Sequence, residues 1–158
     1  MTPEGPFGPF LAGGFWVWKS RQGDVEVRFT GRGLSNDREE ILRAVVGEEP
    51  AAPPLAWAKQ IHSAVALPAQ AGACGEGDAL YTVETGLALS VVTADCVPVL
   101  LAGPEGLAAV HAGWRGIVGG AIPAALDRMT GDSAERTAWI GPAIGPCCYE
   151  VGEDVVDP

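Results

Sequence analysis

Short apolar stretches recur along this chain, and most of them alternate with polar residues or end in glycine and proline. Alternation with a period of two is typical of a half-buried strand, and a short unbroken apolar run is typical of a fully buried one. These patterns predict strands over residues 15–18, 25–30, 55–62, 86–93, 98–102, 107–111 and 137–145. Turn residues near 22–24 and 103–106 predict that two pairs of these strands form hairpins.

Two other segments have the spacing of helices. Residues 35–46 start with capping residues, continue with acidic residues and then place apolar side chains at helical intervals, which predicts a helix. Residues 114–129 show the same periodicity, with Pro123 predicting a kink or an irregular start. Residues 1–14 and 71–78 are rich in turn-forming residues and are predicted to be a loose arm and a flexible loop. Hairpins together with a few helices predict an α+β fold.

Composition narrows the class of protein. A chain of 158 residues with 47% hydrophobic residues is expected to form a single domain over residues 1–158. No uninterrupted apolar stretch reaches the roughly 18 residues of a membrane helix, so no membrane partner is expected. A net charge of −10 without a basic stripe disfavours nucleic acid as a partner. The first ten residues have no basic region followed by an apolar region, and a cytoplasmic location is therefore predicted.

The four cysteines are interpreted as thiols, because a reducing compartment is expected. Cys147 and Cys148 are adjacent and would pair with each other only under strain. These two and Cys74 are interpreted as small buried apolar side chains. Cys96 is the candidate ligand.

Cys96, His62 and His111 form the strongest candidate for chemistry. The chain has only two histidines, and each stands at the C-terminal end of a predicted strand beside small residues. Imidazole and thiolate are donors that zinc prefers, and three protein ligands leave a fourth position for water or substrate. One alternative is that Cys96 is a thiolate nucleophile activated by His111, as in cysteine hydrolases. Another is that both histidines are hydrogen-bonded strand ends and Cys96 belongs to the core.

Three residues beside these candidates have two interpretations each. Asp95 precedes Cys96 and either orients or carries a proton in the site, or caps a turn. Arg115 stands at the start of the predicted helix over 114–129, where a guanidinium either holds a phosphate or carboxylate or makes a surface ion pair. Trp114 either packs or stacks on a base.

Five motifs of this sequence resemble those of the YfiH-type family, whose members are named polyphenol oxidase (laccase domain), purine nucleoside phosphorylase and peptidoglycan editing factor. The motifs are QIHS (60–63), GDA (77–79), TADCVPVLL (93–101), HAGWRG (111–116) and IGPAIGPCCYEV (140–151). The resemblance implies a four-layer α/β/β/α mixed-sheet sandwich related to cytotoxic-necrotising-factor-like cysteine hydrolases. It also implies a zinc ion held by His62, Cys96 and His111, with copper as the alternative metal.

The same resemblance implies phosphorolysis of adenosine, inosine, guanosine and methylthioadenosine, together with adenosine deamination. The expected partners are therefore a purine nucleoside and phosphate, with Cys96, Asp95 and Arg115 as the catalytic candidates. The substrate-binding candidates are Arg115, Trp114, Asn36 and Arg32. Editing of cell-wall precursors and copper-dependent phenol oxidation are the alternative activities of the family. Family members continue well past the motif over 140–151, so the chain is expected to be truncated at its C-terminus relative to them.

Overall fold

The computed structural model describes residues 9–12, 15–31, 37–46 and 52–156. The chain divides into two compact units, residues 1–53 and residues 54–158. None of the helices in these described segments is both long and apolar enough to cross a membrane.

The first unit contains an antiparallel sheet with the strand order β1-β2-β3. Its strands are β1 (Pro9–Ala12), β2 (Phe15–Gln22) and β3 (Val25–Thr30). A turn at Gly23, whose φ of 56° lies in the left-handed region, closes the predicted hairpin between β2 and β3. The prediction of a loose arm over residues 1–14 is wrong for β1. Its backbone pairs with β2, and this tertiary pairing overrides the turn-forming composition of the segment.

One helix, α1 (Arg38–Val46), completes the first unit and confirms the helix predicted over 35–46 within the described residues. The carboxylate of Asp37 accepts hydrogen bonds from the backbone N–H groups of Glu39 and Glu40, at 2.8 and 3.1 Å. This is the N-terminal cap that the sequence predicted.

The second unit contains two sheets and four helices among its described residues. Its strands are β4 (Leu55–Lys59), β5 (Ala66–Pro68), β6 (Gly72–Glu76), β7 (Ala79–Thr82), β8 (Ala88–Ser90), β9 (Val97–Gly103), β10 (Gly106–Ala112) and β11 (Thr137–Ile140). Its helices are α2 (Trp114–Gly119), α3 (Ala121–Leu126), a 3-10 turn (Ser133–Glu135) and α4 (Glu153–Val156). The larger sheet has the order β11-β9-β10-β7-β5, and the smaller sheet has the order β6-β4-β8. In the larger sheet β5 and β7 are parallel and the other pairs are antiparallel, so the sheet is mixed.

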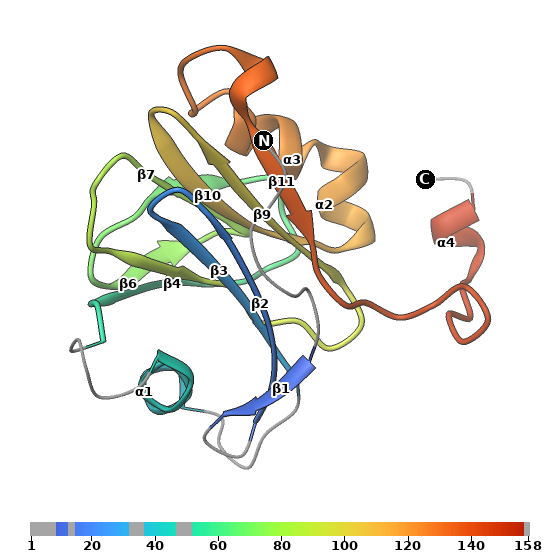
Figure 1. The fold of residues 1–158 in the computed structure, drawn as a ribbon. Helices are drawn as coiled ribbons and strands as arrows, with labels where there is room; N and C mark the ends of the chain where they lie inside the picture. Colours follow the sequence, from blue (N-terminus) through green and yellow to red (C-terminus); the bar gives the residue numbers. More distant parts are fainter. Residues whose placement is uncertain (1–8, 13–14, 32–36, 47–51, 157–158) are drawn as a thin grey trace. The chain divides into compact units, whose positions relative to one another are not determined.

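The larger sheet is covered on both faces. Ala79 of β7 and Val110 of β10 pack with Ala121 and Ala125 of α3 in one buried cluster. The next residue of β7, Leu80, points to the other face and packs with the smaller sheet in a second cluster. Figure 1 shows α2 and α3 beside β9 and β10. The prediction of an α+β fold with mixed sheets is confirmed, and the four-layer sandwich stays a prediction.

Several predicted boundaries in the second unit need correction. The loop predicted over 71–78 contains β6, a glycine-rich strand that forms because it pairs in parallel with β4. The buried strand predicted over 86–93 is reduced to the half-buried β8. The strands predicted over 55–62 and 137–145 end at Lys59 and Ile140.

The helix predicted over 114–129 is two helices, because Gly120 has a φ of 88° and interrupts the helical backbone. The N–H group of Gly120 bonds to the carbonyls of Gly116 and Ile117 and closes α2. Pro123 falls in the first turn of α3, where its missing N–H group costs no helical hydrogen bond. The predicted irregularity at Pro123 is therefore a new helix start.

Candidate metal centre

A buried carboxylate, that of Asp78, organises this region. Asp78 lies immediately before β7 and is 1% exposed. Its backbone N–H bonds to the carbonyl of Val65 and its carbonyl accepts from the N–H of His111, at 3.0 and 2.7 Å. These two bonds fix Asp78 between neighbouring segments of the larger sheet, so the direction of its side chain is set by the fold.

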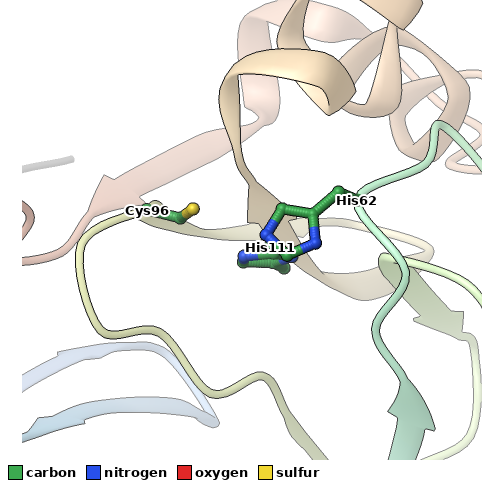
Figure 2. A group of neighbouring side chains, drawn as sticks. All are labelled: His62, Cys96 and His111. Carbon is green, nitrogen blue, oxygen red and sulfur yellow. The ribbon is translucent and has the colours of Figure 1, made fainter. Parts of the chain in front are cut away.

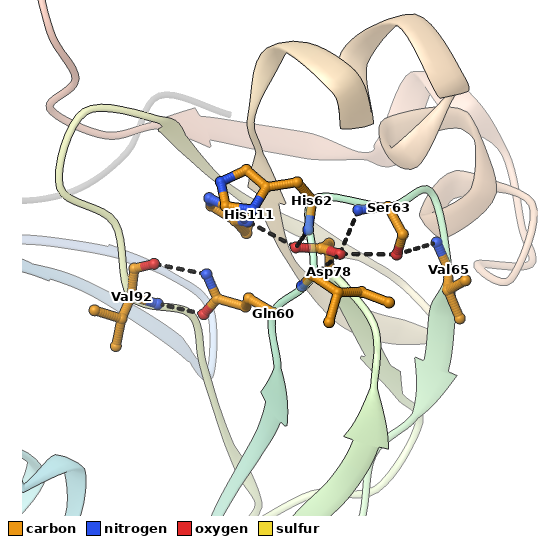
Figure 3. Close-up of polar contacts among 8 residues, drawn as sticks. Gln60, His62, Ser63, Val65, Asp78, Val92 and His111 are labelled. Carbon is orange, nitrogen blue, oxygen red and sulfur yellow. Dashed lines mark hydrogen bonds and ion pairs between the residues drawn. The ribbon is translucent and has the colours of Figure 1, made fainter.

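The turn that carries His62 is wrapped around this carboxylate (Figure 3). The N–H groups of Ile61, His62 and Ser63 bond to it at 3.2, 3.0 and 2.6 Å, and the Ser63 hydroxyl donates to it at 2.8 Å. His62 has a φ of 59°, which is an unfavourable conformation for a residue with a side chain. The three converging N–H groups stabilise the turn in that conformation.

The ring of His111 is the fifth group bound to the Asp78 carboxylate. Its Nδ1 lies 2.8 Å from a carboxylate oxygen of Asp78, and His111 is 4% exposed. An ionised carboxylate only accepts, so Nδ1 carries the proton and the lone pair of Nε2 is available to a metal. Burial raises the pKa of Asp78, but hydrogen bonds from His111, Ser63 and Ile61 outweigh burial and lower that pKa to about 2. The carboxylate is therefore ionised at neutral pH.

The third residue, Cys96, lies in a bend directly before β9 and is half-buried. The loop before it is joined to the His62 turn by Gln60, whose amide donates to the carbonyl of Val92 at 2.7 Å and accepts from its N–H at 2.9 Å. Burial and the negative charges of Asp95 and Asp78 raise the pKa of the Cys96 thiol. A neighbouring cation would oppose that shift and favour the thiolate.

His62, Cys96 and His111 come together as the sequence predicted (Figure 2). One donor atom from each residue lies within 4.8 Å of the others, and the two imidazole rings are 4.9 Å apart at an angle of 78°. A Cβ atom on Gly113 would lie 3.1 Å from the His62 ring and 3.2 Å from Cys96 Sγ. Glycine at this position leaves the space between the donors free. Two imidazoles, one thiol and this space fit a zinc ion.

The other predicted site residues differ in where the structure places them. Asp95 is exposed in the bend beside Cys96, and its backbone carbonyl accepts from the N–H of Ile144 at 3.0 Å. Trp114 and Arg115 follow Gly113 in the first turn of α2, and the guanidinium of Arg115 stacks over the Trp114 ring at 4.1 Å. Their roles in substrate binding stay predictions. Arg32 and Asn36 lie outside the described residues.

Asp78, Gln60 and Gly113 also belong to this site, although their residue types alone indicate no role. All three were inside the motifs that carried the resemblance, in GDA, QIHS and HAGWRG. A polar residue directly before an apolar run was the available signal for Asp78. Its partners lie 15 to 33 positions away in sequence, and only the fold identifies them.

Comparison with known proteins supports the motif resemblance. Residues 34–158 match a protein family described as multi-copper polyphenol oxidoreductase laccase. A purine nucleoside phosphorylase of Streptomyces coelicolor is 41% identical over 132 residues, covering 78% of this chain and 54% of that protein. Purine nucleoside phosphorylase YfiH of Escherichia coli K12 is 37% identical over 126 residues, covering 77% and 50%. The chain spans about half the length of these curated relatives.

Solved structures give the same relationship. A Neisseria meningitidis protein matches with a TM-score of 0.66 and 31% identity, over 90% of this chain and 63% of that chain. A Bacillus licheniformis hypothetical protein YfiH matches with a TM-score of 0.64 and 26% identity, over 90% and 64%. The resemblance to the YfiH family is thereby confirmed.

Proposed function

Because this chain belongs to the family described as multi-copper polyphenol oxidoreductase laccase, we propose that it holds one zinc ion through His62, Cys96 and His111 and acts on purine nucleosides. This proposal rests on one observation: the donor atoms of His62, Cys96 and His111 form a cluster, and Asp78 is hydrogen-bonded to the His111 ring. We call these three residues the donor cluster. Relatives named purine nucleoside phosphorylase support the choice of substrate class.

The donor set favours a single ion. Two imidazoles and one thiolate are typical of a catalytic zinc site. Zinc bound in this way acts as a Lewis acid and lowers the pKa of a bound water. The chain prepares for the ion by keeping the Nε2 atom of His111 unprotonated through the bond from Nδ1 to Asp78.

In phosphorolysis, an oxygen of phosphate forms a bond to the ribose carbon while the bond from that carbon to the purine nitrogen breaks. Arg115 would bind the phosphate through its guanidinium, and Trp114 would stack on the base. Asp95, exposed beside Cys96, would carry a proton to the departing base. Arg32 and Asn36 would contact the nucleoside. In this proposal the chain acts on adenosine, inosine, guanosine and methylthioadenosine, and it also deaminates adenosine.

Copper-dependent phenol oxidation is the second candidate, and the description of the matched family favours it. Multi-copper sites bind their ions mostly through histidine, and these 158 residues contain two histidines. The donor cluster therefore suits one ion better than several.

Nucleophilic catalysis by Cys96, as in a cysteine hydrolase that edits cell-wall precursors, is disfavoured. Burial, Asp95 and Asp78 raise the pKa of the thiol, which favours its protonated form where no cation is bound. A thiolate nucleophile requires the opposite shift.

The test combines elemental analysis with an assay of inosine cleavage. We expect about one zinc ion per chain and release of hypoxanthine that requires phosphate. Cys96→Ser should abolish both, whereas Cys74→Ser should change neither. If the purified chain takes up no zinc and leaves inosine intact in phosphate buffer, the proposal is wrong. Copper uptake with oxidation of a phenol would support the second candidate.

A further inference from the structure

Two cysteines outside the metal centre lie side by side at the surface. Cys147 and Cys148 are both free and exposed, and their Sγ atoms are 3.3 Å apart. The sequence suggested that they were small buried side chains, and their exposure corrects that interpretation. Neither belongs to the group of donors that could hold a metal among the described residues.

A tight turn brings the two sulfurs together. In an extended strand, neighbouring side chains point to opposite faces. Here the N–H of Cys148 bonds to the carbonyl of Gly145 at 3.0 Å, and the chain turns over residues 146–148. Both thiols are therefore accessible to the same reagent and to each other.

The segment that carries this turn is attached to the metal centre. The N–H of Ile144 bonds to the carbonyl of Asp95, and the N–H of Gly141 bonds to the carbonyl of Pro98, at 3.0 and 2.9 Å. Cys96 lies between Asp95 and Pro98 in sequence. Ile144 directly precedes the turn and is hydrogen-bonded to Asp95, the neighbour of Cys96. A change in the backbone over 145–148 can therefore reach Cys96 through this one hydrogen bond.

We propose that Cys147 and Cys148 form a reversible redox-modification site, which a hydroperoxide converts to a disulfide and which thereby weakens metal binding at Cys96. Formation of the disulfide does not depend on the proposed function. Its effect on metal binding rests on the metal centre proposed above. The dithiol is the reduced form, and thiol reductants restore it.

The oxidation is balanced by one hydroperoxide. Both thiols are exposed, so either sulfur can react first. One sulfur attacks hydrogen peroxide, the O–O bond breaks, and a sulfenic acid and one water form. The neighbouring thiol then attacks the sulfenic sulfur, the S–S bond forms, the S–O bond breaks, and a second water leaves. The two sulfurs together lose two electrons, and the peroxide is reduced to water.

The product differs in shape from the dithiol. A disulfide bond is about 2 Å long, so the two sulfurs must approach and the turn must change. A disulfide between neighbouring residues is strained and exposed, and such bonds are easily reduced. Reversibility follows from that strain. The altered turn would displace Ile144 from Asp95 and disturb the position of Cys96.

The experiment treats the full chain with hydrogen peroxide and then alkylates the remaining thiols before mass spectrometry. We expect loss of two hydrogens, a peptide in which Cys147 and Cys148 are linked, and unlinked Cys74 and Cys96. A reductant should restore all four thiols. Cys148→Ser should abolish the linkage, and the matched variant Cys74→Ser should retain it. If both adjacent thiols remain alkylated after peroxide treatment, no modification site exists.

Zinc affinity, measured by competition with a chromogenic chelator, tests the coupling. We expect the disulfide form to bind zinc about tenfold more weakly than the reduced form, as for loss of a residue that supports a ligand. In Cys148→Ser the affinity should not respond to peroxide. Equal affinity in the two forms would overturn the coupling. Mass spectrometry requires neither zinc nor a nucleoside, so its result is separate from the fate of the proposed function.

Discussion

Asp78 binds groups from two of the three metal ligands at once, the ring of His111 and the backbone of His62. Asp78→Asn keeps the shape but replaces one acceptor oxygen by a donor that faces the N–H groups of the turn. We expect zinc affinity to fall about tenfold to a hundredfold, which is the usual loss for a carboxylate behind a metal-binding histidine. Chelator competition measures this change.

Asp95→Asn is the matched control, because it removes the same charge close to Cys96. The carboxylate of Asp95 is exposed, and the bond to Ile144 uses the backbone carbonyl. Zinc affinity should change little in this variant. An equal loss in both variants would mean that charge, rather than the hydrogen bonds of Asp78, determines affinity.

The low pKa of Asp78 also predicts a pH dependence of stability. Its folded-state pKa of about 2 lies below the ordinary 3.8, so the ionised form stabilises the fold. The contribution is present above about pH 4 and is lost as the pH falls through 2. It amounts to at most about 2 kcal/mol in the free energy of unfolding. Urea unfolding of metal-free protein should therefore show a larger decrease between pH 5 and pH 2.5 in the wild type than in Asp78→Asn. Parallel curves for the two proteins would contradict this assignment.

Gly113 tests the space between the donors. Its φ of −71° is accessible to any residue, so Gly113→Ala causes no backbone strain. The added Cβ would lie against His62 and Cys96, at distances that force them to move. We expect loss of zinc binding with little change in the thermal unfolding of the metal-free chain. Gly119→Ala, at the other end of α2, should keep normal zinc binding.

At the scale of elements, local patterns predicted most strands and the N-terminal cap of α1, and tertiary pairing accounts for the failures. The β9–β10 hairpin has apolar strands around a glycine-proline turn, and it was predicted nearly to the residue. Strand β6 has a glycine-rich sequence typical of a loop and becomes a strand only beside β4. The position of His62 likewise depends only in part on the local sequence. The strand ends at Lys59, and the turn that follows depends on the distant Asp78.

The break between α2 and α3 gives a prediction for Gly120. Its φ is 88°, and a Cβ at this position would meet no atom within 4 Å. Gly120→Ala should therefore destabilise the chain through backbone conformation alone, by about 1 kcal/mol. Gly119→Ala is the matched control: it adds a methyl group within the helix and should be neutral or slightly stabilising. Denaturant unfolding compares the two. Equal stability of both variants would contradict a left-handed cap at Gly120.

At the scale of the molecule, the three predicted ligands were recognisable from residue type. The residues that hold them in position were not. Zinc-binding donors are few in this chain, with two histidines and four cysteines, so the choice was narrow. Asp78 and Gln60 are common residue types, and their roles arise from hydrogen bonds between segments far apart in sequence. The fold adds a physical reason for each ligand's position.

All residues of this metal centre belong to the second unit, residues 54–158. A chain that starts at Pro54 should therefore bind zinc with nearly the affinity of the full chain, because every donor and Asp78 are retained. Circular dichroism establishes whether the shortened chain is folded, and chelator competition measures its zinc affinity. A folded fragment that binds no zinc would contradict the assignment of the metal centre to residues 54–158.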